Sequence, residues 1–361
     1  MSELVALAER LIGYETSEPE AISEAAGFVK GWLEARGIEA IQEEIRGLPV
    51  TRAEVGPAGA PTVVLHGHLD VVPGRPGQFE PRTEGDRLYG RGAYDMKGAL
   101  AAMLVVAAGM RDQEEVRVRL GIVGDEESEE ETDRGSDHLV DSGFIGDFAI
   151  TGEPTDLHIG VEAKGVLAVR LAVAGTAAHG ATPWLGDNAV LKAIDVFRGI
   201  ESLPFARHSS ELFDRPSINL GRIWGGDALN KVPDRCVIDV DIRYLPDQDS
   251  AEVLDQVRGL PDVEVLSTFW RPPAVVDPGS VFVRALREAA AVHYEGEPTS
   301  VGRDGASDVV SFQRVGVPAV EFGPIGAGHH GPAEWVSVSS LESYRQTLDS
   351  FLRRIPERLD D

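Results

Sequence analysis

A nearly continuous apolar segment, Met96 to Met110 (MKGALAAMLVVAAGM), most constrains how this chain can fold. A helix formed there has no polar face, so it must be buried on all sides. Apolar runs typical of short buried strands flank it along the chain, at 61–66, 116–123 and 147–152. Strands that alternate with helices indicate an α/β domain with a mainly parallel sheet flanked by helices. We therefore expect the apolar helix to pack against such a sheet.

The pattern changes after residue 165. Over 166–272 the expected elements follow the order β-α-β-β-α-β, which is the split βαβ unit of a small two-layer domain. The Pro-rich segment 271–279 (RPPAVVDPG) indicates the return linker. A chain of 361 residues also exceeds the size at which one hydrophobic core stops growing. We therefore expect a larger domain at 1–165 and 273–361, with a compact two-layer domain at 166–272 inserted into it.

The charge balance and the single cysteine exclude several classes of protein. The formal net charge of −26 repels phosphate backbones, so we expect no nucleic-acid partner. Cys236 stands alone in an apolar segment, which excludes an internal disulfide and a thiolate metal cage. No apolar run is long enough to span a membrane, and the N-terminal segment lacks the pattern of a signal peptide. These features predict a cytoplasmic protein without a membrane partner.

Three polar residues end the apolar strand at 63–70 (VVLHGHLD). His66, His68 and Asp70 alternate along the chain, so their side chains share one face of the strand. The carboxyl ends of strands are where open α/β sheets place their ligand crevices. An imidazole can bind zinc through one nitrogen while a carboxylate accepts from the other. A hydrogen-bonded polar strand end is the alternative.

Acidic residues follow other expected strands or begin the apolar helix. Asp95 opens that helix, where a carboxylate is either a helix N-cap or a bridge between two cations. Glu126 and Glu127 follow the strand at 116–123, and Glu153 follows the next one. The acidic run at 129–133 is more typical of a solvated turn.

A Gly/Pro-rich loop near the C-terminus carries His329 and His330 (GAGHHGPAEWV). One of these histidines, together with the candidates above, would complete a mixed set of nitrogen and oxygen ligands. Such a set suits zinc, and cobalt or manganese could substitute for it. Two ions about 3.5–4 Å apart need such a set with one bridging member, and the water between them becomes a nucleophile. Glu126 is then available as a general base. One such set consists of His68, Asp95, Glu127, Glu153 and His330, although spacing alone leaves His66 and His329 open as alternatives to the two histidines.

Seven ordered motifs resemble the di-zinc family that includes acetylornithine deacetylase, succinyl-diaminopimelate desuccinylase, aminoacylase-1 and carboxypeptidase G. They are HGHLDVVP, LYGRGAYDMKG, DEE, TGEPT, GTAAHGATPWLGDNAV, GGDALNKVPDRCVIDVDIR and HHGPAEWV, and they span nearly the whole chain. The resemblance implies a catalytic α/β domain, two bound zinc ions and an inserted lid through which the protein forms a homodimer.

The resemblance also implies roles for the metal-site residues. It selects His68 over His66, with Asp70 as the partner of its second ring nitrogen. It makes Asp95 the bridging ligand, pairs His68 with Glu153 on one ion, and pairs Glu127 with His330 on the other. His330 is favoured over His329 because Glu334 follows it by four residues, as in the family. Glu126 is implied to be the general base.

Three lid residues are implied to act on the substrate. His179 resembles the family's oxyanion-stabilising histidine, which reaches the active site of the other subunit. Asn230 and Arg243 resemble its binders of the substrate carboxylate. The chain departs from the desuccinylase branch at Ala163 and Lys164, where that branch carries two arginines.

These observations predict metal-dependent hydrolysis of the amide bond of a small N-acyl-amino acid. A dipeptidase or glutamate-type carboxypeptidase with the same metal chemistry, acting on a dipeptide, is the alternative within the family. A non-catalytic acidic protein that binds cations through the run at 125–133 (DEESEEETD) is the alternative from another class.

Overall fold

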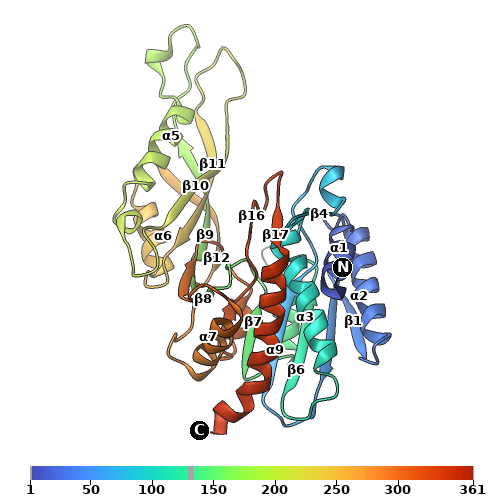
Figure 1. Ribbon diagram of the computed structural model, residues 1–361. Coiled ribbons are helices and arrows are strands. Elements are labelled where there is room, and N and C mark those ends of the chain that lie inside the picture. The colour runs from blue at the N-terminus through green and yellow to red at the C-terminus, as the bar shows by residue number, and fades with distance from the viewer. Residues whose placement is uncertain (1, 129–133, 361) are drawn as a thin grey trace. The chain divides into compact units, whose positions relative to one another are not determined.

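The computed structural model describes residues 2–128 and 134–360 (Figure 1). The chain forms two compact units. The first comprises Met1–Val161, Val276–Val301 and Asp308–Asp361, and the second comprises Glu162–Val275 and Gly302–Ser307. From the sequence, the domain boundaries were expected at 165/166 and 272/273, and the short segment 302–307 was not expected to belong to the lid.

A mixed sheet forms the centre of the first unit. Its centre is parallel, because β3 pairs in parallel with both β6 and β7, and β7 pairs in parallel with β15. The β1–β2 hairpin joins β6 in antiparallel fashion, and the hairpin is a part that the sequence analysis did not predict. In spatial order the strands are β1 (Ala40–Ile45), β2 (Leu48–Val55), β6 (Arg117–Val123), β3 (Thr62–His68), β7 (Phe148–Thr151), β15 (Ala319–Glu321) and β8 (Ile159–Ala163).

The apolar helix α3 (Gly98–Gly109) is buried against this sheet, as its composition predicts. It packs beside α9 (Val338–Asp360) and α1 (Glu3–Ile12), and α9 packs on α7 (Val281–His293) (Figure 1). Strand β3 comes so close that a Cβ on Gly67 would lie 2.6 Å from Met96 Cε. Gly67 therefore allows the backbone of β3 to approach the start of the helix.

Shorter helices complete the first unit. α4 (Gly135–Asp141) packs on β6, and α8 (Val309–Gln313) packs on α4, β7 and β15. α2 (Pro19–Glu34) packs on the β1–β2 hairpin. A second small antiparallel sheet has the order β16 (Gly326–Ala327), β17 (Trp335–Ser337), β5 (Arg87–Tyr89) and β4 (Arg82–Glu84).

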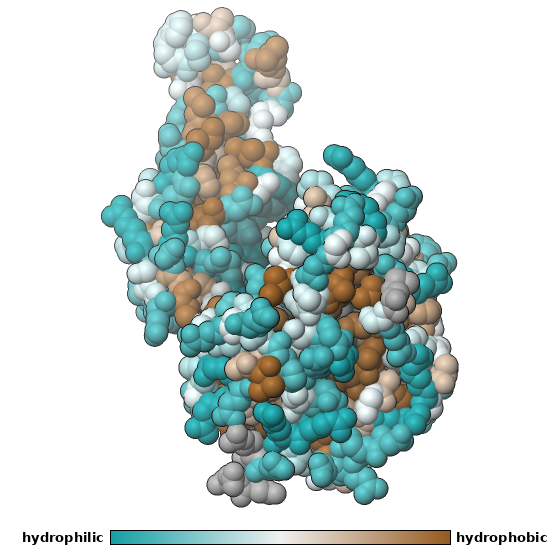
Figure 2. Space-filling view, in the orientation of Figure 1, coloured by the Kyte–Doolittle hydropathy of each residue, from teal (hydrophilic) through white to brown (hydrophobic). Residues whose placement is uncertain are grey.

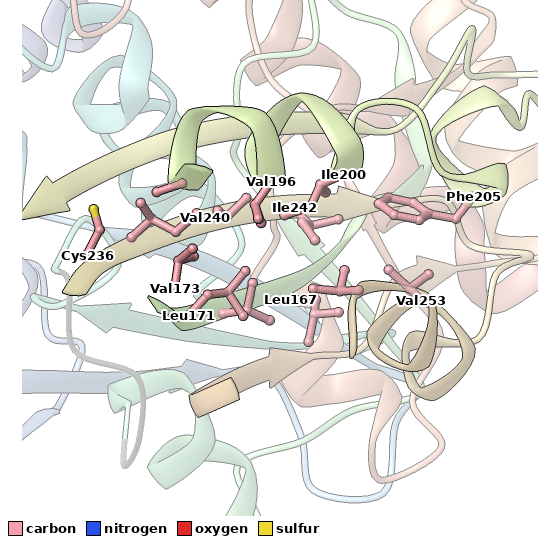
Figure 3. Close-up of a cluster of buried hydrophobic side chains, with 14 of the residues drawn as sticks. Leu167, Leu171, Val173, Val196, Ile200, Phe205, Cys236, Val240, Ile242 and Val253 are labelled. Atoms are coloured by element: carbon pink, nitrogen blue, oxygen red, sulfur yellow. The ribbon is translucent and has the colours of Figure 1, made fainter. Parts of the chain in front are cut away.

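The second unit is a two-layer domain with the expected order of elements. Its sheet is antiparallel, in the order β10 (Ser217–Gly225), β11 (Arg235–Tyr244), β9 (Gly165–Ala174) and β12 (Val263–Arg271). Helices α5 (Ala189–Ile200) and α6 (Ser250–Arg258) cover the sheet, and Figure 3 shows their apolar side chains among those of the strands. Cys236 is fully buried in this core, as a small apolar side chain would be.

The remaining elements are short. Strands β13 (Ala274–Val275) and β14 (Ser300–Arg303) both pair with β8. Single helical turns lie at Pro76–Phe79, Pro183–Leu185 and Pro204–Arg207, and an irregular turn lies at Ala93–Lys97. Among the helices of the described residues, we find none with the length and apolar character needed to cross a membrane.

Candidate metal centre

Three of the proposed ligands lie where parallel strands of the large sheet end. His68 is the last residue of β3, Glu127 follows β6, and Glu153 follows β7. Because β6 and β7 both pair in parallel with β3, the three strand ends lie at the same edge of the sheet. This edge is where doubly wound α/β proteins bind their ligands.

The other two proposed ligands come from loops of the small sheet. Asp95 lies in the turn Ala93–Lys97 that follows β5, and His330 lies between β16 and β17. Pairing of Tyr89 in β5 with Trp335 in β17 brings these loops together. Lys97, not Asp95, is the N-cap residue of α3, so the alternative of Asp95 as a helix cap is wrong.

Glu334 holds the loop that carries Asp95. Its carboxylate accepts hydrogen bonds from the backbone N–H groups of Gly92, Tyr94 and Asp95 at 3.0–3.1 Å. Arg91 donates to the same carboxylate at 2.8 Å and, through its other terminal nitrogen, to the carbonyl oxygen of His330 at 3.3 Å. The buried Arg91–Glu334 pair therefore ties both ligand loops together. In the sequence, Glu334 is recognisable only as part of a motif, and Arg91 was not predicted to take part although it lies inside the motif LYGRGAYDMKG.

Asp95 lies between the two proposed histidine ligands. Its Oδ1 is 3.4 Å from His68 Nε2, and its Oδ2 is 3.4 Å from His330 Nε2. Glu153 Oε1 lies 3.6 Å from His68 Nε2, and Glu127 Oε1 lies 2.8 Å from His330 Nε2. The five side chains thus form two groups that share Asp95, each able to surround one cation.

The remaining ring nitrogen of His68 is oriented by the backbone. Nδ1 donates to the carbonyl oxygen of Asp70 at 2.9 Å, which leaves Nε2 facing Asp95. The Asp70 carboxylate lies farther from Nδ1, at 3.5 Å, and its Oδ2 accepts from the backbone N–H of Glu127 at 2.7 Å. Asp70 therefore contacts both ligands, but its carbonyl rather than its carboxylate is the nearer partner of His68.

His66 lies apart from the two groups. Its Nδ1 is 3.4 Å from the hydroxyl of Thr151, and its ring packs edge-on against Phe312. Burial lowers the pKa of His66 to about 4, so the ring is neutral at physiological pH. Within the described residues, His66 belongs to neither cation-sized group, and the ring of His329 contacts those of Tyr94 and His330 instead.

The buried carboxylates of the cluster make the binding of positive charge favourable. Burial, and then the nearby charge of Asp95, raises the pKa of Glu153 well above its usual range. Burial, and then the charge of Asp308, raises the pKa of Glu126 to about 8. Hydrogen bonds with Asp95 and Glu127 raise the pKa of His330 to about 10. Without cations, these buried carboxylates are therefore stabilised by protons on the cluster.

The donor set fits divalent metal ions of the zinc class. Considering the described residues alone, His68 Nε2 and Glu153 Oε1 are buried without a hydrogen-bond partner, although they face each other across a short gap. A cation in that gap would satisfy both atoms. The set contains nitrogen and oxygen but no sulfur, which suits zinc, cobalt or manganese. Glu126 lies within a third group with His68 and Glu127, so its carboxylate also borders the centre.

The three predicted lid residues lie in the second unit. His179 and Asn230 are neighbours there, because the N–H of Gly180 donates to the carbonyl oxygen of Asn230 at 2.7 Å. Both side chains are exposed. Arg243, on β11, donates to the carboxylate of Asp241 at 3.0 Å. The acidic residues 129–133 lie outside the described residues.

Fold and site together define a metal-dependent hydrolase of amide bonds. The model of peptidase family M20/M25/M40 matches residues 64–354, and the chain belongs to this family. The family match confirms the resemblance predicted from the seven motifs and excludes the non-catalytic acidic protein as a description of this chain.

Similar proteins span nearly the same length. A succinyl-diaminopimelate desuccinylase of Erythrobacter litoralis is 30% identical over 95% of this chain and 96% of its own. A putative succinyl-diaminopimelate desuccinylase, DapE, of Mycobacterium tuberculosis is 34% identical over 73% of each chain. A solved M20 metallo-carboxypeptidase, Sso-CP2, of Sulfolobus solfataricus matches with a TM-score of 0.81 at 22% identity, covering 99% of this chain and 100% of its own. This likeness confirms the mixed α/β fold with a separate antiparallel domain.

Proposed function

We propose that this protein is a di-zinc hydrolase that releases the free amine from a small N-acyl-amino acid. The observation that carries the proposal is Asp95, whose two carboxylate oxygens face two separate histidine–carboxylate pairs. A carboxylate in that position is suited to bridge two ions, and the opposite charges would relieve the repulsion among the buried acids.

Each ion would have its own ligands besides Asp95. His68 and Glu153 would hold one ion, and Glu127 and His330 would hold the other. When bound, the two ions supply a Lewis acid for the scissile carbonyl and acidify the attacking water. Cobalt or manganese would serve as substitutes for zinc with the same donor set.

Glu126 is proposed as the general base. Its side chain borders the cluster, and burial raises its pKa to about 8. Cations bound beside it would lower this pKa again, and the ionised carboxylate could then take a proton from water and return it to the leaving nitrogen. Asp70 would support the centre through its contacts with His68 and with the backbone of Glu127.

The lid residues are proposed to bind the substrate. Arg243 and Asn230 would bind the substrate carboxylate, for which the planar guanidinium group of Arg243 is well shaped. His179 would donate to the oxyanion that develops during amide hydrolysis. His179 is exposed, and its Nδ1 accepts a hydrogen bond from the nearby N–H of Ala181, so its imidazole is accessible to a ligand.

The acyl group need not be succinyl. Lys164, at a position where desuccinylases carry an arginine, is buried and held by Asp304 and the carbonyl oxygen of Arg215, both at 2.7 Å. Its ammonium group therefore already has two partners within the second unit.

The alternative of a dipeptidase or carboxypeptidase is favoured by the similarity to the metallo-carboxypeptidase and to a Staphylococcus aureus tripeptidase, which has a TM-score of 0.81 at 20% identity and covers 98% of both chains.

A homodimer through the second unit is part of the proposal. Figure 2 shows apolar side chains at the surface of this unit. Leu191 and Ile194 on α5, and Ile223 and Trp224 on the edge strand β10, are 41–61% exposed. Large apolar side chains gathered on an edge strand and its adjoining helix are typical of a protein–protein contact.

The test is the turnover of Glu126→Gln by the zinc-loaded protein. The substrates are acetyl-, succinyl- and formyl-amino acids beside dipeptides, and released amine is measured. Loss of the base should lower kcat by about 10²–10⁴-fold while zinc content stays at two ions per chain. Glu114→Gln, at an exposed residue outside the site, is the matched control. Wild-type turnover by folded, zinc-loaded Glu126→Gln would contradict the proposed role, and the substrate panel decides between deacylase and peptidase.

A further inference from the structure

A set of partly and fully buried charged side chains lies behind the turn that carries Glu126. It consists of Arg134 at the start of α4 and Asp308 at the start of α8. The two residues are 174 positions apart in sequence, and neither belongs to the seven motifs that relate the chain to its family. Arg134 nevertheless contacts one residue of the proposed machinery, Glu126, and Asp308 lies beside Arg134.

Arg134 binds the backbone of the Glu126 turn. Its Nη1 donates to the carbonyl oxygen of Glu126 at 3.0 Å, and its Nη2 donates to that of Ser128 at 3.4 Å. The same Nη1 lies 3.9 Å from the Glu126 carboxylate. One guanidinium group therefore contacts both the main chain and the side-chain charge of Glu126, which limits the directions in which the carboxylate can point.

Asp308 holds Arg134 from the other side. Its Oδ1 lies 3.6 Å from Arg134 Nη1, and the Asp308 side chain is only 1% exposed. The Arg134 side chain is 14% exposed, although an arginine at a helix start can extend into water. Burying a charged side chain costs free energy, and a fixed partner of opposite charge beside it offsets that cost. Asp308 also lies 3.8 Å from the Nε2 atom of His66. It therefore packs against strand β3, two residues before the proposed ligand His68.

The turn has a second, separate attachment that does not involve Arg134. The Asp125 carboxylate accepts from the backbone N–H of Gly135 at 2.8 Å, and the Ser128 hydroxyl donates to the carbonyl oxygen of Asp125 at 2.9 Å. These bonds fix the turn to α4 without contacting the Glu126 side chain. The guanidinium of Arg134 therefore adds something that the turn's own bonds do not supply, namely a fixed positive charge beside the base.

We propose that Arg134, held in place by Asp308, is a positioning residue for Glu126 in the hydrolysis reaction. The inference rests on the proposed role of Glu126 as the base. Arg134 acts only through Glu126, by keeping its carboxylate aimed at the water between the ions, and it touches neither substrate nor metal. A displacement of a catalytic group by about 1 Å can lower the rate by about 10²-fold.

The experiment is a double-mutant cycle on the zinc-loaded full-length protein. Arg134→Ala should lower kcat by about 10–10²-fold with little change in KM or in bound zinc, because only the aim of the base is lost. Arg134→Lys, which keeps the charge, should recover part of kcat. In the Glu126→Gln background, Arg134→Ala should cause no further loss of the residual rate.

The matched control is Arg119→Ala. Arg119 resembles Arg134 in contacts, since it donates to the carbonyl oxygens of Gly143 and Ile145 and pairs with Glu54. Its side chain is 19% exposed, but the carbonyl groups that it binds precede β7, at the opposite end of that strand from Glu153. Arg119→Ala should lower the melting temperature and leave kcat unchanged.

The outcomes are distinguishable. Equal losses from Arg134→Ala in the wild-type and Glu126→Gln backgrounds, or a loss of bound zinc, would overturn the positioning role. If Arg134→Ala does not fold, Arg134→Lys and Asp308→Asn provide the same cycle, and unchanged kcat in both would overturn it as well. Wild-type turnover in Glu126→Gln alone would instead reject the proposed function, whatever Arg134 does.

Discussion

At the scale of single residues, the candidate centre depends on carboxylates that each contact more than one group. Asp95 faces two histidines with its two oxygens. The Glu334 carboxylate accepts hydrogen bonds from three backbone N–H groups and one guanidinium group, and these bonds fix the loop of Asp95. Second partners of this kind orient metal ligands and commonly change metal affinity by about 10–100-fold when removed.

The two histidines of the C-terminal loop should differ in their effect on metal content. His330→Ala removes the only nitrogen ligand of the second proposed ion, so bound zinc should fall from two ions per chain to about one. His329→Ala is the neighbouring control, because His329 contacts the ring of Tyr94 and belongs to neither cation-sized group of described residues. Metal analysis after gel filtration measures both. Two tightly bound ions in His330→Ala would contradict the proposed ligand set.

At the scale of elements, one exposed carboxylate joins the small sheet to the C-terminal helix. Asp86, in the β4–β5 turn, accepts from the backbone N–H of Ser339 at 2.8 Å and from the hydroxyls of Ser337 and Ser339 at 2.6 and 2.9 Å. Ser339 is in the first turn of α9, whose N–H groups have no partner within the helix. Asp86 thus caps α9 from another element and fixes the strand β17 that follows the His330 loop.

Asp86→Ala should destabilise the protein by about 1 kcal/mol, as the loss of a helix cap does. Burial opposes ionisation of Asp86, but the bonds from Ser337 and Ser339 outweigh it and hold its pKa below the usual value. The contribution of Asp86 is therefore complete above the unfolded-state pKa of about 3.9 and is lost as the pH falls through the lower folded-state pKa.

Urea unfolding of the wild type and of Asp86→Ala at several pH values checks this prediction. The difference in unfolding free energy should be constant above about pH 5 and should shrink below about pH 4. Asp86→Asn retains an acceptor without the charge and should lose less stability than Asp86→Ala. A difference that grows as the pH falls would contradict the assignment.

At the scale of the whole molecule, the second unit has a core of its own and several exposed apolar side chains at its surface. Its core is formed by the two helices and one face of the sheet (Figure 3). Leu191 and Ile194 on α5 are instead 61% and 42% exposed. The formal net charge of −26 makes association of two copies unfavourable unless an apolar contact offsets it.

Leu191→Glu combined with Ile194→Glu should therefore convert the proposed dimer to a monomer. The two substitutions place charges on adjacent turns of the same helix face, where burial of an unpaired charge is costly. Leu266→Glu, a 40% exposed position on the opposite edge strand β12, is the control. Light scattering coupled to gel filtration gives the mass of each variant. A wild-type protein that is monomeric at all concentrations would reject the dimer.

Whether a feature could be predicted depends on whether the residues that form it are close together or far apart in sequence. Short apolar runs and the polar residues directly after them depend on neighbours in sequence, and they predicted the strands β3, β6 and β7 and the candidates at their ends. The β1–β2 hairpin was missed because its strands are partly exposed and rich in charged residues. The carboxylate of Asp70 was expected to contact His68, but local backbone geometry places the carbonyl closer.

By itself, the sequence determined the fold class, the two-layer unit, the family and the residue types available for a metal centre, because these follow from periodicity, composition and ordered motifs. Only the tertiary structure decided which oxygen of Asp95 faces which histidine, how Glu334 and Arg91 tie two loops together, and that Arg134 and Asp308 meet behind Glu126. The reason is physical: each of these contacts joins side chains far apart in sequence, and their distances are set by how the strands pair and the helices pack, which local patterns do not encode.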